Sequence, residues 1–545
     1  MGTNGFTAEH KHPLVEMIQV AAPTVVTMTS YTVMQFIDAQ MVSRIGPEEV
    51  YVAAQGNGGM AVWFAMSFAL GLMSVINTFV SQNLGAGRPG HGAAYAWNGL
   101  WISAVCAVLM LPYGLSLPWI FGSAMGHDGQ LLEMETGYGQ ILIYGAVLTM
   151  GARCIAHYFY GMHRPMVVMI AVIAANVVNA LANATLIFGA AGLPKGSGDT
   201  GLFIRLLDPI AAACAATAHI LGVAGLGVNG AALGTIIGSG VELLIPMLVF
   251  VGPRMQAKYR TRLSWRPALG PIKDILRIGW PAGLMFANEM VCWWWLMSKL
   301  VPTAGEAAAV AAGAVPGGLE ARTAGVIANS AGWIAIRYMH VSFMPAIGLS
   351  IAVTAIVGRC LGMKRPDLAA HRTYLGLLIT MAYMGLCAMA FILFRRWMIL
   401  QFVAASTPAE TVQRLLAAGS PIMIAAAVFQ LFDAMAITIS GALRGAGDTV
   451  WPGVVTIVAS WACLVGVGQL LIGIAPQLGS LGPWIGASVY IIVVGVLFTG
   501  RFLGGKWRQL DLLTDTEPPL GAVRGPEAPL SAPPDAVAGT TPGSV

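Results

Sequence analysis

The chain has 545 residues, of which 57% are hydrophobic and only 10% are Asp, Glu, Lys or Arg. A soluble globular protein carries about 25% of these charged residues, so much of this chain cannot face water. The formal net charge of +5 is the balance of 29 basic and 24 acidic residues spread along the chain, without the basic block typical of nucleic-acid binding. The composition excludes a nucleic-acid-binding protein and predicts an all-α integral membrane protein with about a dozen spans.

Twelve apolar segments follow one another along the chain. Each is long enough for a membrane-spanning helix, which needs about 20 apolar residues, and each is apolar on all sides instead of alternating like a membrane β-strand. The first segment lacks a small-residue cleavage site, so it is interpreted as a span and not as a removed signal. The segments lie near residues 17–42, 54–83, 94–120, 138–160, 166–190, 225–252, 276–301, 326–357, 373–402, 415–441, 451–475 and 483–502.

The connections between the spans indicate the orientation. Lys and Arg are in excess in cytoplasmic loops, and the densest basic stretch here, residues 253–275, follows the sixth span. Arg395 and Arg396 count against the rule, but the balance still predicts that both termini are cytoplasmic, in the inner membrane of the cell. Two long external loops are expected at 191–224 and 303–325, the first with a short helix near residues 210–221. The tail from residue 509 is rich in Pro, Gly and Ala and is expected to be disordered.

The two halves of the chain resemble each other. Residues 80–89, VSQNLGAGRP, and 357–366, VGRCLGMKRP, share five of ten positions, and Pro23 early in the first span matches Pro281 early in the seventh. Gly230-Ala231 in span six similarly matches Gly486-Ala487 in span twelve. Six spans per half give both copies the same topology, so the axis that relates them runs along the membrane normal. We expect an N-terminal lobe at 1–252, a basic linker at 253–275, a C-terminal lobe at 276–508 and a tail at 509–545.

Three acidic residues lie within predicted spans: Asp38, Glu289 and Asp433. A charge at the bilayer centre costs about 2.5–3.5 kcal/mol, so such a residue usually faces a cavity or a partner. A carboxylate in a membrane can hold a proton, bind Na⁺ or pair with an organic cation, and one group that serves mutually exclusive cations is the minimal machinery of an antiporter. The other ionisable span residues fit buried ion pairs or hydrogen-bonded groups near the interface equally well: Arg153, His157, Glu242, Arg337 and His340. Lys299, close to a span end, is expected to extend its amine to the membrane interface.

Several motifs recur in an order that covers both halves. They are Ala22-Pro23 with Phe36-Ile37-Asp38, Val80–Arg88, Asn179–Gly189, Gly230–Thr235, Gly279–Pro281 with Glu289, Phe429–Asp433 and Gly441–Thr449. In this order and spacing the chain resembles the multidrug and toxic compound extrusion (MATE) transporters over almost all of residues 14–505, and it looks most like the NorM branch. The resemblance implies a fold of twelve transmembrane helices in two six-helix lobes.

The resemblance also implies two cation sites. Glu289 and Asp433 match the pair of acids that bind the coupling cation, such as Na⁺, in the C-terminal lobe, with Gln430 beside them in the same motif. In the N-terminal lobe the matching residues are Asp38, Asn179, Asn183 and Thr235. Another branch of the family has an aspartate where this chain has Asn183, so a second titrating acid is missing from this lobe.

Two further features have two interpretations each. Pro23 and Pro281 interrupt helical hydrogen bonding, so they are either hinges of the first helix of each lobe or static kinks. The 29 methionines and the run Trp293-Trp294-Trp295 fit either an adaptable cation-binding pocket or ordinary packing. Consecutive helical residues point about 100° apart, so at most one or two of these tryptophans face a common cavity.

The sequence therefore predicts a secondary multidrug transporter that exports amphipathic organic cations in exchange for Na⁺ or H⁺. It is expected to act as a monomer in the lipid bilayer without a cofactor, since no nucleotide-binding P-loop is present and the seven scattered cysteines form no C-x-x-C pair for a metal. One alternative is a lipid or lipid-linked oligosaccharide flippase of the same superfamily, which should line its cavity with basic residues. A second is a membrane enzyme, for which no catalytic cluster is found.

Overall fold

The computed structural model describes residues 12–46, 50–192, 212–220, 222–403 and 407–513. These residues form helices joined by short turns, and the described part of the chain contains no strand. The prediction of an all-α protein is therefore confirmed. Residues 514–545 of the expected tail lie outside the described residues.

The first half of the chain contains six helical spans. Two of them are divided into shorter helices, because α3 continues α2 after a break at Val75 and α6 continues α5 after Gly145. The helices are α1 (Pro13–Val42), α2 (Val50–Ser74), α3 (Ile76–Gly85), α4 (Pro89–Trp119), α5 (Gly129–Tyr144), α6 (Ala146–Gly161), α7 (Pro165–Phe188) and α9 (Val228–Phe250).

The second half repeats this order. The short helix α10 (Pro253–Tyr259) leads into it, and π-helical segments interrupt its first and fifth spans at 296–300 and 460–467. The helices are α11 (Leu269–Trp295), α12 (Val301–Ala311), α13 (Leu319–Gly362), α14 (Pro366–Leu400), α15 (Ala409–Ala446), α16 (Val450–Ala459), α17 (Gly468–Ile474) and α18 (Leu481–Leu503).

Hydropathy separates the first helix of each half from the rest. Among the described residues, nine helices are long and apolar enough to cross a membrane, or ten if the α5–α6 pair, bent by 48°, counts as one span. The remaining two spans of the twelve-helix fold are α1 and α11, which contain Asp38 and Glu289. The polar groups that weaken the membrane signal thus occur in the same helix of each half.

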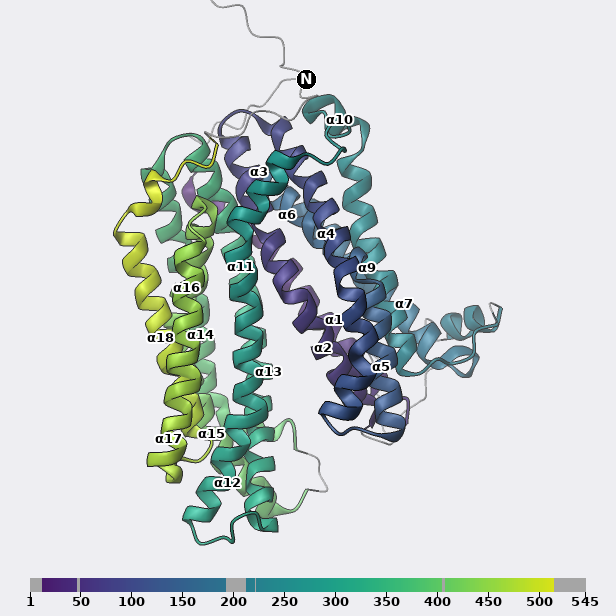
Figure 1. The fold of residues 1–545 in the computed structure, drawn as a ribbon, viewed down its shortest axis with the longest axis vertical. Coiled ribbons are helices and arrows are strands. Elements are labelled where there is room, and N and C mark those ends of the chain that lie inside the picture. Colours follow the sequence, from purple (N-terminus) through teal and green to yellow (C-terminus); the bar gives the residue numbers. More distant parts are fainter. Residues whose placement is uncertain (1–11, 47–49, 193–211, 221, 404–406, 514–545) are drawn as a thin grey trace, which may run out of the picture.

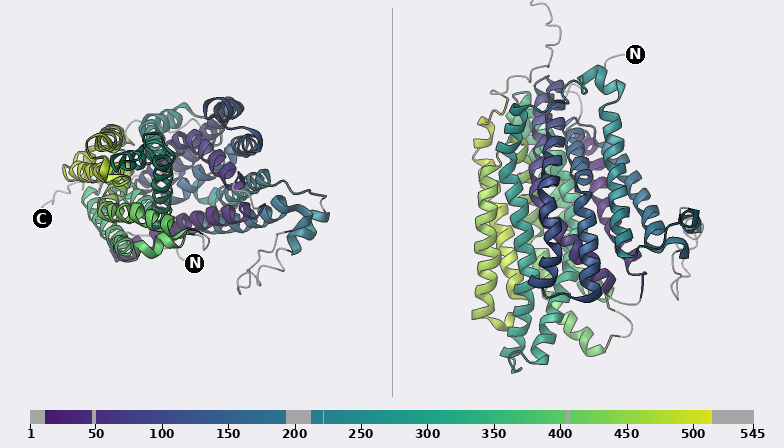
Figure 2. Two further views of the ribbon diagram at one scale, coloured as in Figure 1. Left: turned by 90° about the horizontal axis from the view of Figure 1, so that it is seen from below. Right: turned by 45° about the vertical axis from the view of Figure 1, so that its right-hand side comes forward.

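The two halves form two groups of helices that lie together near the N-terminus and separate toward the opposite end (Figure 1). The helices run roughly parallel, and helix 212–220 projects from the side of the bundle (Figure 2). Hydrogen bonds join the groups in the half nearer the N-terminus, from Thr24 Oγ1 to the Gly348 carbonyl (2.8 Å) and from Asn77 Nδ2 to the Ile351 carbonyl (3.2 Å). The lobes are therefore closed at the end that the sequence predicts to be cytoplasmic.

The repeated motif lies at this closed end, where α3 crosses α13. Gly85 of α3 packs against the carbonyl oxygen of Arg359, and Gly362 of α13 packs against the carbonyl oxygen of Gln82. Gly85 and Gly362 occupy corresponding positions of the repeat, as do Gln82 and Arg359. The contact is therefore reciprocal, and a Cβ atom at either glycine would overlap the opposite backbone. The pseudo-twofold axis passes through this crossing.

Four connections at the same end share one turn geometry. In each, a residue with positive φ follows the helix, and the next residue donates its N–H to the carbonyl five residues earlier, at 2.8–2.9 Å. This is the 6→1 bond of a Schellman cap. The four bonds run from Arg88 to Asn83, Arg164 to Phe159, Arg365 to Cys360 and Asp448 to Leu443.

The linker between the lobes is held along α4. Trp97 Nε1 donates to the Thr261 carbonyl (2.7 Å), and Trp101 Nε1, one turn further along, donates to the Trp265 carbonyl (2.8 Å). The Asn98 side chain accepts the backbone N–H of Ala268 (2.8 Å). Since α11 begins at Leu269, the last part of the predicted linker 253–275 is already helix.

The expected external loops differ from the structure at one place. Residues 303–325 are mostly helical, because α12 continues to Ala311 and α13 begins at Leu319, so the expectation of a long loop there is wrong. Ala is the strongest helix former, and eight of the eleven residues of 303–313 are Ala or Gly. In the other loop, residues 212–220 are helical, as expected for 210–221, and residues 193–211 lie outside the described part.

Candidate functional site

In the N-terminal lobe, Asp38 of α1 meets two asparagines of α7. Asn183 Nδ2 donates to Asp38 Oδ1 at 2.6 Å and to Asn179 Oδ1 at 3.0 Å. Both asparagines are fully buried, and Asp38 is 8% exposed. The structure thus brings together three of the four residues that the sequence predicts for this site.

Two glycines of α9 make room for this cluster. Asn183 packs against Gly234 and Asn179 packs against Gly238, so closely that a Cβ atom at either glycine would overlap the asparagine. Glycines four residues apart lie on one face of a helix, which explains why both asparagines fit. Thr235, the fourth predicted residue, is directed elsewhere, because its hydroxyl donates to the Ala231 carbonyl of its own helix (3.0 Å).

Two buried polar atoms beside Asp38 have no hydrogen-bond partner among the described residues. They are Asn183 Oδ1 and Asn179 Nδ2. Buried polar groups are almost always paired, so an unpaired atom in a protein interior needs an explanation. An amide oxygen next to a carboxylate is a suitable ligand for a hard cation such as Na⁺.

In the C-terminal lobe, Glu289 of α11 lies among residues from two other helices. Tyr490 of α18 donates its hydroxyl to Glu289 Oε1 at 2.8 Å, and Asp433 of α15 is close enough to interact electrostatically with Glu289. Gln430, one turn before Asp433, donates to Ser342 Oγ of α13 at 3.0 Å, and its Oε1 has no hydrogen-bond partner among the described residues. The predicted pair of acids therefore shares one site.

Arg444 lies on the same side of the lobe as Glu289, a placement that the sequence did not indicate. Its guanidinium lies 5.7 Å from the ring centroid of Phe286, one turn before Glu289, and it interacts electrostatically with Glu289. Eleven residues separate Asp433 from Arg444, which is about three helical turns, so both side chains project from one face of α15. That spacing was visible in the sequence.

A second set of bonds fixes α11 beside this site. Asn288, the neighbour of Glu289, accepts a hydrogen bond from Trp461 Nε1 and donates one to Ser460 Oγ, both at 2.8 Å. Ser460 and Trp461 begin the π-helical segment 460–467. Such segments frequently occur at functional sites, and this one directs two side chains at the helix that holds Glu289.

Two of the other ionisable span residues form an ion pair, as one interpretation of the sequence anticipated. Arg153 Nη1 lies 3.7 Å from Glu242 Oε1, and the Arg153 guanidinium lies 3.8 Å above the ring of Tyr31. Tyr31 donates its hydroxyl to the same Glu242 oxygen at 2.5 Å. This cluster lies in the N-terminal lobe, seven residues before Asp38 on α1 and therefore about 10 Å nearer the closed end.

The three consecutive tryptophans have different neighbours. Trp293 packs near Trp484 and Trp294 packs near Phe64, with ring centroids 6.3 and 6.0 Å apart, whereas Trp295 is 37% exposed. The run therefore does not line one pocket. Pro23 and Pro281 are buried, and α1 and α11 both continue through their proline as single helices.

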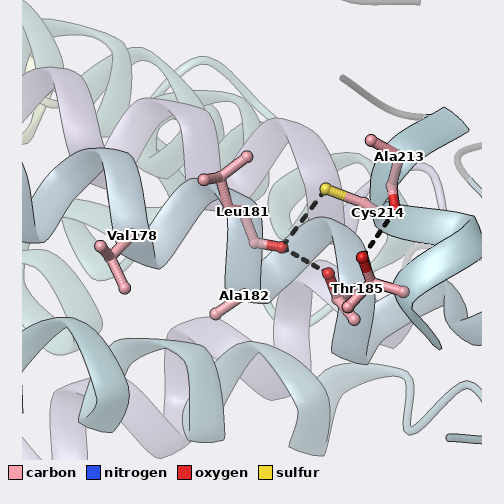
Figure 3. Close-up of a pocket in the computed structure, with 7 residues that line it drawn as sticks. Val178, Leu181, Ala182, Thr185, Ala213 and Cys214 are labelled. Atoms are coloured by element: carbon pink, nitrogen blue, oxygen red, sulfur yellow. Dashed lines mark hydrogen bonds between the residues drawn. The ribbon is translucent and has the colours of Figure 1, made fainter. Parts of the chain in front are cut away.

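A pocket of about 550 Å³ lies between α7 and helix 212–220 (Figure 3). In this pocket, Cys214 Sγ and Thr185 Oγ1 both approach the Leu181 carbonyl. None of the predicted site residues lines it. Among the described residues no group of three His, Cys, Asp or Glu side chains could hold a metal ion, so a Na⁺ site at Glu289 and Asp433 would need hydroxyl, amide or carbonyl ligands as well.

Comparison with known proteins identifies the family. The family model MatE matches residues 23–185 and 321–467, which together make up more than half of the chain. The chain belongs to the MatE family. The matched ranges include Asp38, Asn183 and Asp433, and their two parts fall on the two lobes.

Relatives with curated names are similar over almost the whole chain. A probable multidrug resistance protein NorM from Synechococcus sp. is 26% identical over 497 residues, which are 90% of this chain and 94% of the relative. The multidrug resistance protein NorM from Burkholderia vietnamiensis is 25% identical over 492 residues, 90% of this chain and 93% of the relative. This MatE-family chain is therefore a NorM-like transporter.

Solved structures share the fold at low sequence identity. A MOP superfamily transporter from Pyrococcus furiosus has a TM-score of 0.74 at 19% identity and covers 93% of this chain and 100% of its own. The eukaryotic MATE transporter AtDTX14 has a TM-score of 0.71 at 16% identity, covering 91% and 97%. A MATE structure described as the bent conformation has a TM-score of 0.69 at 18% identity, covering 93% and 99%. These likenesses confirm the twelve-helix MATE fold.

Proposed function

We propose that this MatE-family transporter exports amphipathic organic cations across the inner membrane in exchange for Na⁺ or H⁺. The observation that carries the proposal is the position of Glu289, a carboxylate inside a membrane bundle that interacts with Asp433, Tyr490 and Arg444. Two acids and one arginine leave a net negative charge, which favours a further cation. The multidrug resistance names of the two NorM relatives support drugs as substrates.

Exchange follows if the coupling ion and the drug compete for this charge. In the arrangement described above, the lobes are joined at one end by the crossing of Gly85 and Gly362. With the closed end cytoplasmic, as the basic loops predict, Glu289 and Asp433 take up the coupling ion from outside and release the drug. If the coupling ion lowers the affinity for the drug, the drug lowers the affinity for the coupling ion by the same factor.

The Asp38 site contributes in the N-terminal lobe. Asn183 and Asn179 give it hydrogen bonds but no second acid, so this lobe binds a single positive charge at Asp38. The unpaired Asn183 oxygen supplies an additional ligand for Na⁺. A proton on Asp38 instead leaves that oxygen unused, so the geometry of this lobe favours Na⁺ as its coupling ion.

Return to the cytoplasm requires the closed end to open. The glycine contacts between α3 and α13 separate, and α1 and α11 bend at Pro23 and Pro281, where a backbone hydrogen bond is missing in any case. The solved MATE described as bent has a counterpart described as the straight conformation, with a TM-score of 0.71 to this chain at 20% identity. Solved structures with this fold are thus described in both a bent and a straight conformation.

The test uses the full chain reconstituted in liposomes, with a Na⁺ gradient and a proton gradient imposed separately and a cationic dye as substrate. Glu289→Gln and Asp433→Asn are expected to lower gradient-driven transport at least about tenfold, since each removes a charge whose electrostatic contribution is worth more than 1.4 kcal/mol. Asp38→Asn should lower transport with Na⁺ more than with protons.

Glu410→Gln is the control for these variants. This glutamate lies on α15 as Asp433 does, but it is exposed and pairs with Arg414 one turn along, so it should leave transport unchanged. Dye transport that survives Asp38→Asn, Glu289→Gln and Asp433→Asn at the rate of the Glu410→Gln control would exclude these acids as the coupling site.

A further inference from the structure

Each lobe contains an acid, a tyrosine and an arginine in a similar arrangement. In the C-terminal lobe the tyrosine–acid bond joins the first and sixth helices, because Glu289 lies on α11 and Tyr490 on α18. Arg444 comes from α15, the fourth span of the lobe, and its guanidinium lies over an aromatic ring of the first helix, that of Phe286. We call these three residues the C-terminal triad.

The same three residue types occur in the N-terminal lobe. Tyr31 lies on α1, the first helix, and donates to Glu242 on α9, the sixth span. Arg153 comes from α6, in the fourth span, and its guanidinium lies over the ring of Tyr31 on the first helix. In this N-terminal triad the acid and the tyrosine have exchanged helices, while the arginine stays on the corresponding span.

The positions correspond closely on the first helices but not on the fourth spans. Arg153 lies six residues before Phe159 and Arg444 one residue after Leu443, the residues whose carbonyls accept the matching Schellman bonds, so the two arginines differ by seven residues, about two turns. Tyr31 follows Pro23 by eight residues, and Glu289 follows Pro281 by eight. On the sixth spans, Gly227 (φ 55°, ψ −134°) and Gly479 (φ 52°, ψ −136°) have the same backbone conformation just before α9 and α18. Counted from these glycines, Glu242 and Tyr490 differ in position by four residues, about one helical turn.

The arginine of the N-terminal triad neutralises the acid without covering it. The distance from Arg153 Nη1 to Glu242 Oε1 is 3.7 Å, longer than a hydrogen bond, whereas Tyr31 makes the short bond to that oxygen. The Arg153 side chain keeps 24% of its surface exposed, and that of Glu242 keeps 9%. The guanidinium can therefore move away from the acid while the tyrosine holds the carboxylate in place.

We propose that Glu242 is a second cation-exchange centre of the transporter, at which Arg153 is the resident cation that a transported monovalent cation displaces. The inference rests on the proposed antiport function and extends it to a residue outside the predicted site. One carboxylate can balance only one positive charge in a low-dielectric interior, so a second cation binds Glu242 only when Arg153 has left. His157 follows Arg153 by one turn on α6.

Equilibrium binding to the full chain in lipid nanodiscs tests the proposal, with ²²Na⁺ and radiolabelled tetraphenylphosphonium as separate probes. Arg153→Gln removes the resident cation and should tighten binding of at least one probe about tenfold, the change that 1.4 kcal/mol produces. Tighter Na⁺ binding alone assigns the centre to the coupling ion, and tighter tetraphenylphosphonium binding alone assigns it to the substrate. The double variant Arg153→Gln with Glu242→Gln should lose the gain.

A purely structural ion pair predicts the opposite result. If Arg153 only stabilises the fold, Arg153→Gln leaves the affinity of both probes unchanged or lowers it, and either outcome overturns the proposal. Arg153→Lys keeps the positive charge and should bind both probes as the parent does. Comparison with Arg153→Gln therefore distinguishes an effect of losing the charge that competes with the probes from an effect of a less stable fold. If Arg153→Gln does not fold, Glu242→Gln alone decides, because the proposal requires it to bind fewer cations per molecule than the parent.

Two further variants separate this proposal from the proposed function. Glu135→Gln is the matched control, since Glu135 is a fully buried glutamate of the same lobe that bonds Asn57 (2.9 Å) and His127 (2.7 Å) at the opposite end; it should leave cation binding unchanged. Glu289→Gln reports on the C-terminal lobe alone. Loss of cation binding in Glu289→Gln without any effect of Arg153→Gln overturns only the second centre, whereas unchanged binding in Glu289→Gln overturns the proposed function.

Discussion

The two lobes share one backbone plan but hold their polar groups differently. In the N-terminal lobe Asp38 is buried against the amides of Asn179 and Asn183. In the C-terminal lobe Glu289 and Asp433 are only partly buried and share their site with Arg444. The repeated backbone thus gives both lobes the same crossing. The side chains differ, so that the site of the N-terminal lobe is enclosed and that of the C-terminal lobe is more open.

One pair of corresponding glycines shows how this divergence is accommodated. Gly234 of α9 and Gly486 of α18 both follow the positive-φ glycine at 227 or 479 by seven residues. The backbone therefore pairs Gly486 with Gly234, one turn beyond Gly230, the match expected from the sequence. Gly234 makes room for the Asn183 side chain, whereas Gly486 lets the backbone of residues 463–468, which includes a π-helical stretch, come close. The same small residue admits a polar side chain in one lobe and an irregular backbone in the other.

The largest expected effect breaks what the lobes have in common, the reciprocal crossing of α3 and α13. Gly85→Val and Gly362→Val each place a side chain against the carbonyl of Arg359 or Gln82. Overpacking costs about 1–3 kcal/mol or more, so both variants should lose most transport and make the closed end accessible to a thiol reagent at an introduced cysteine. Gly500→Val is the control, because a Cβ atom at Gly500 meets no atom within 4 Å. A large effect of only one of the two glycines would show that the crossing is not symmetric.

The next effect separates the two corresponding glycines of α9 and α18. Gly234→Ala displaces the Asn183 side chain and should lower the stability of the detergent-purified protein by about 2 kcal/mol, measured as the denaturant midpoint, together with a loss of Na⁺ binding at Asp38. Gly240→Ala on the same helix meets only an ordinary contact with Leu148 at 3.8 Å and should be neutral or slightly stabilising. Equal stability of the two variants would contradict the packing of Asn183 described here.

A smaller change makes the N-terminal lobe more like the C-terminal one. Asn183→Asp places a second carboxylate 2.6 Å from Asp38, and two adjacent carboxylates cannot both remain charged, so the pair holds a proton near neutral pH. Dye transport driven by a proton gradient should rise about tenfold relative to transport driven by Na⁺, an effect of about 1.4 kcal/mol. An unchanged ratio would show that Asp38 takes no part in ion coupling.

The smallest effect compares the two tyrosine–acid bonds. Tyr490→Phe and Tyr31→Phe remove hydrogen bonds to Glu289 and Glu242, and a hydrogen bond in a protein contributes about 1 kcal/mol net. Cation affinity measured in nanodiscs should change about fivefold in both. Tyr144→Phe is the control, because that tyrosine is 52% exposed. An effect of Tyr490→Phe alone would mean that only the C-terminal triad exchanges cations.

Much of the fold follows from the sequence because a membrane imposes strong length and polarity requirements. Long apolar segments predicted the helices, and the repeat at 80–89 and 357–366 located the residues that cross at the closed end. The failure at 303–325 has a simple cause: a run of Ala and Gly between spans carries no hydrophobic signal, yet Ala readily extends a helix. The hydropathy of a segment alone cannot distinguish a loop from a helix that extends beyond the membrane.

The site was predicted in part for a related reason. Acids inside apolar spans are costly and therefore conspicuous, which is why Asp38, Glu289 and Asp433 were found. Tyr490, the partner of Glu289, and Tyr31, the partner of Glu242, were not found. A tyrosine in an apolar helix carries no such cost and fits lipid, core or site equally well. Thr235 illustrates the opposite error, since its spacing allowed a site role but its hydroxyl bonds its own helix.

The sequence by itself determined the number and order of the helices, the twofold repeat and the acids that a bilayer makes expensive. Only the tertiary structure decided which side chain meets which acid, because contacts between helices depend on their rotation and on how closely glycines let them approach. Glu242 contacts Tyr31 and Arg153, which lie on two other helices, and Tyr31 is 211 positions away in the sequence. The apolar patterns of these three helices do not indicate how the helices are rotated relative to one another. Local apolarity is enough to predict a helix. Which helix of a lobe carries the acid and which carries the tyrosine that bonds it depends on how the helices pack together.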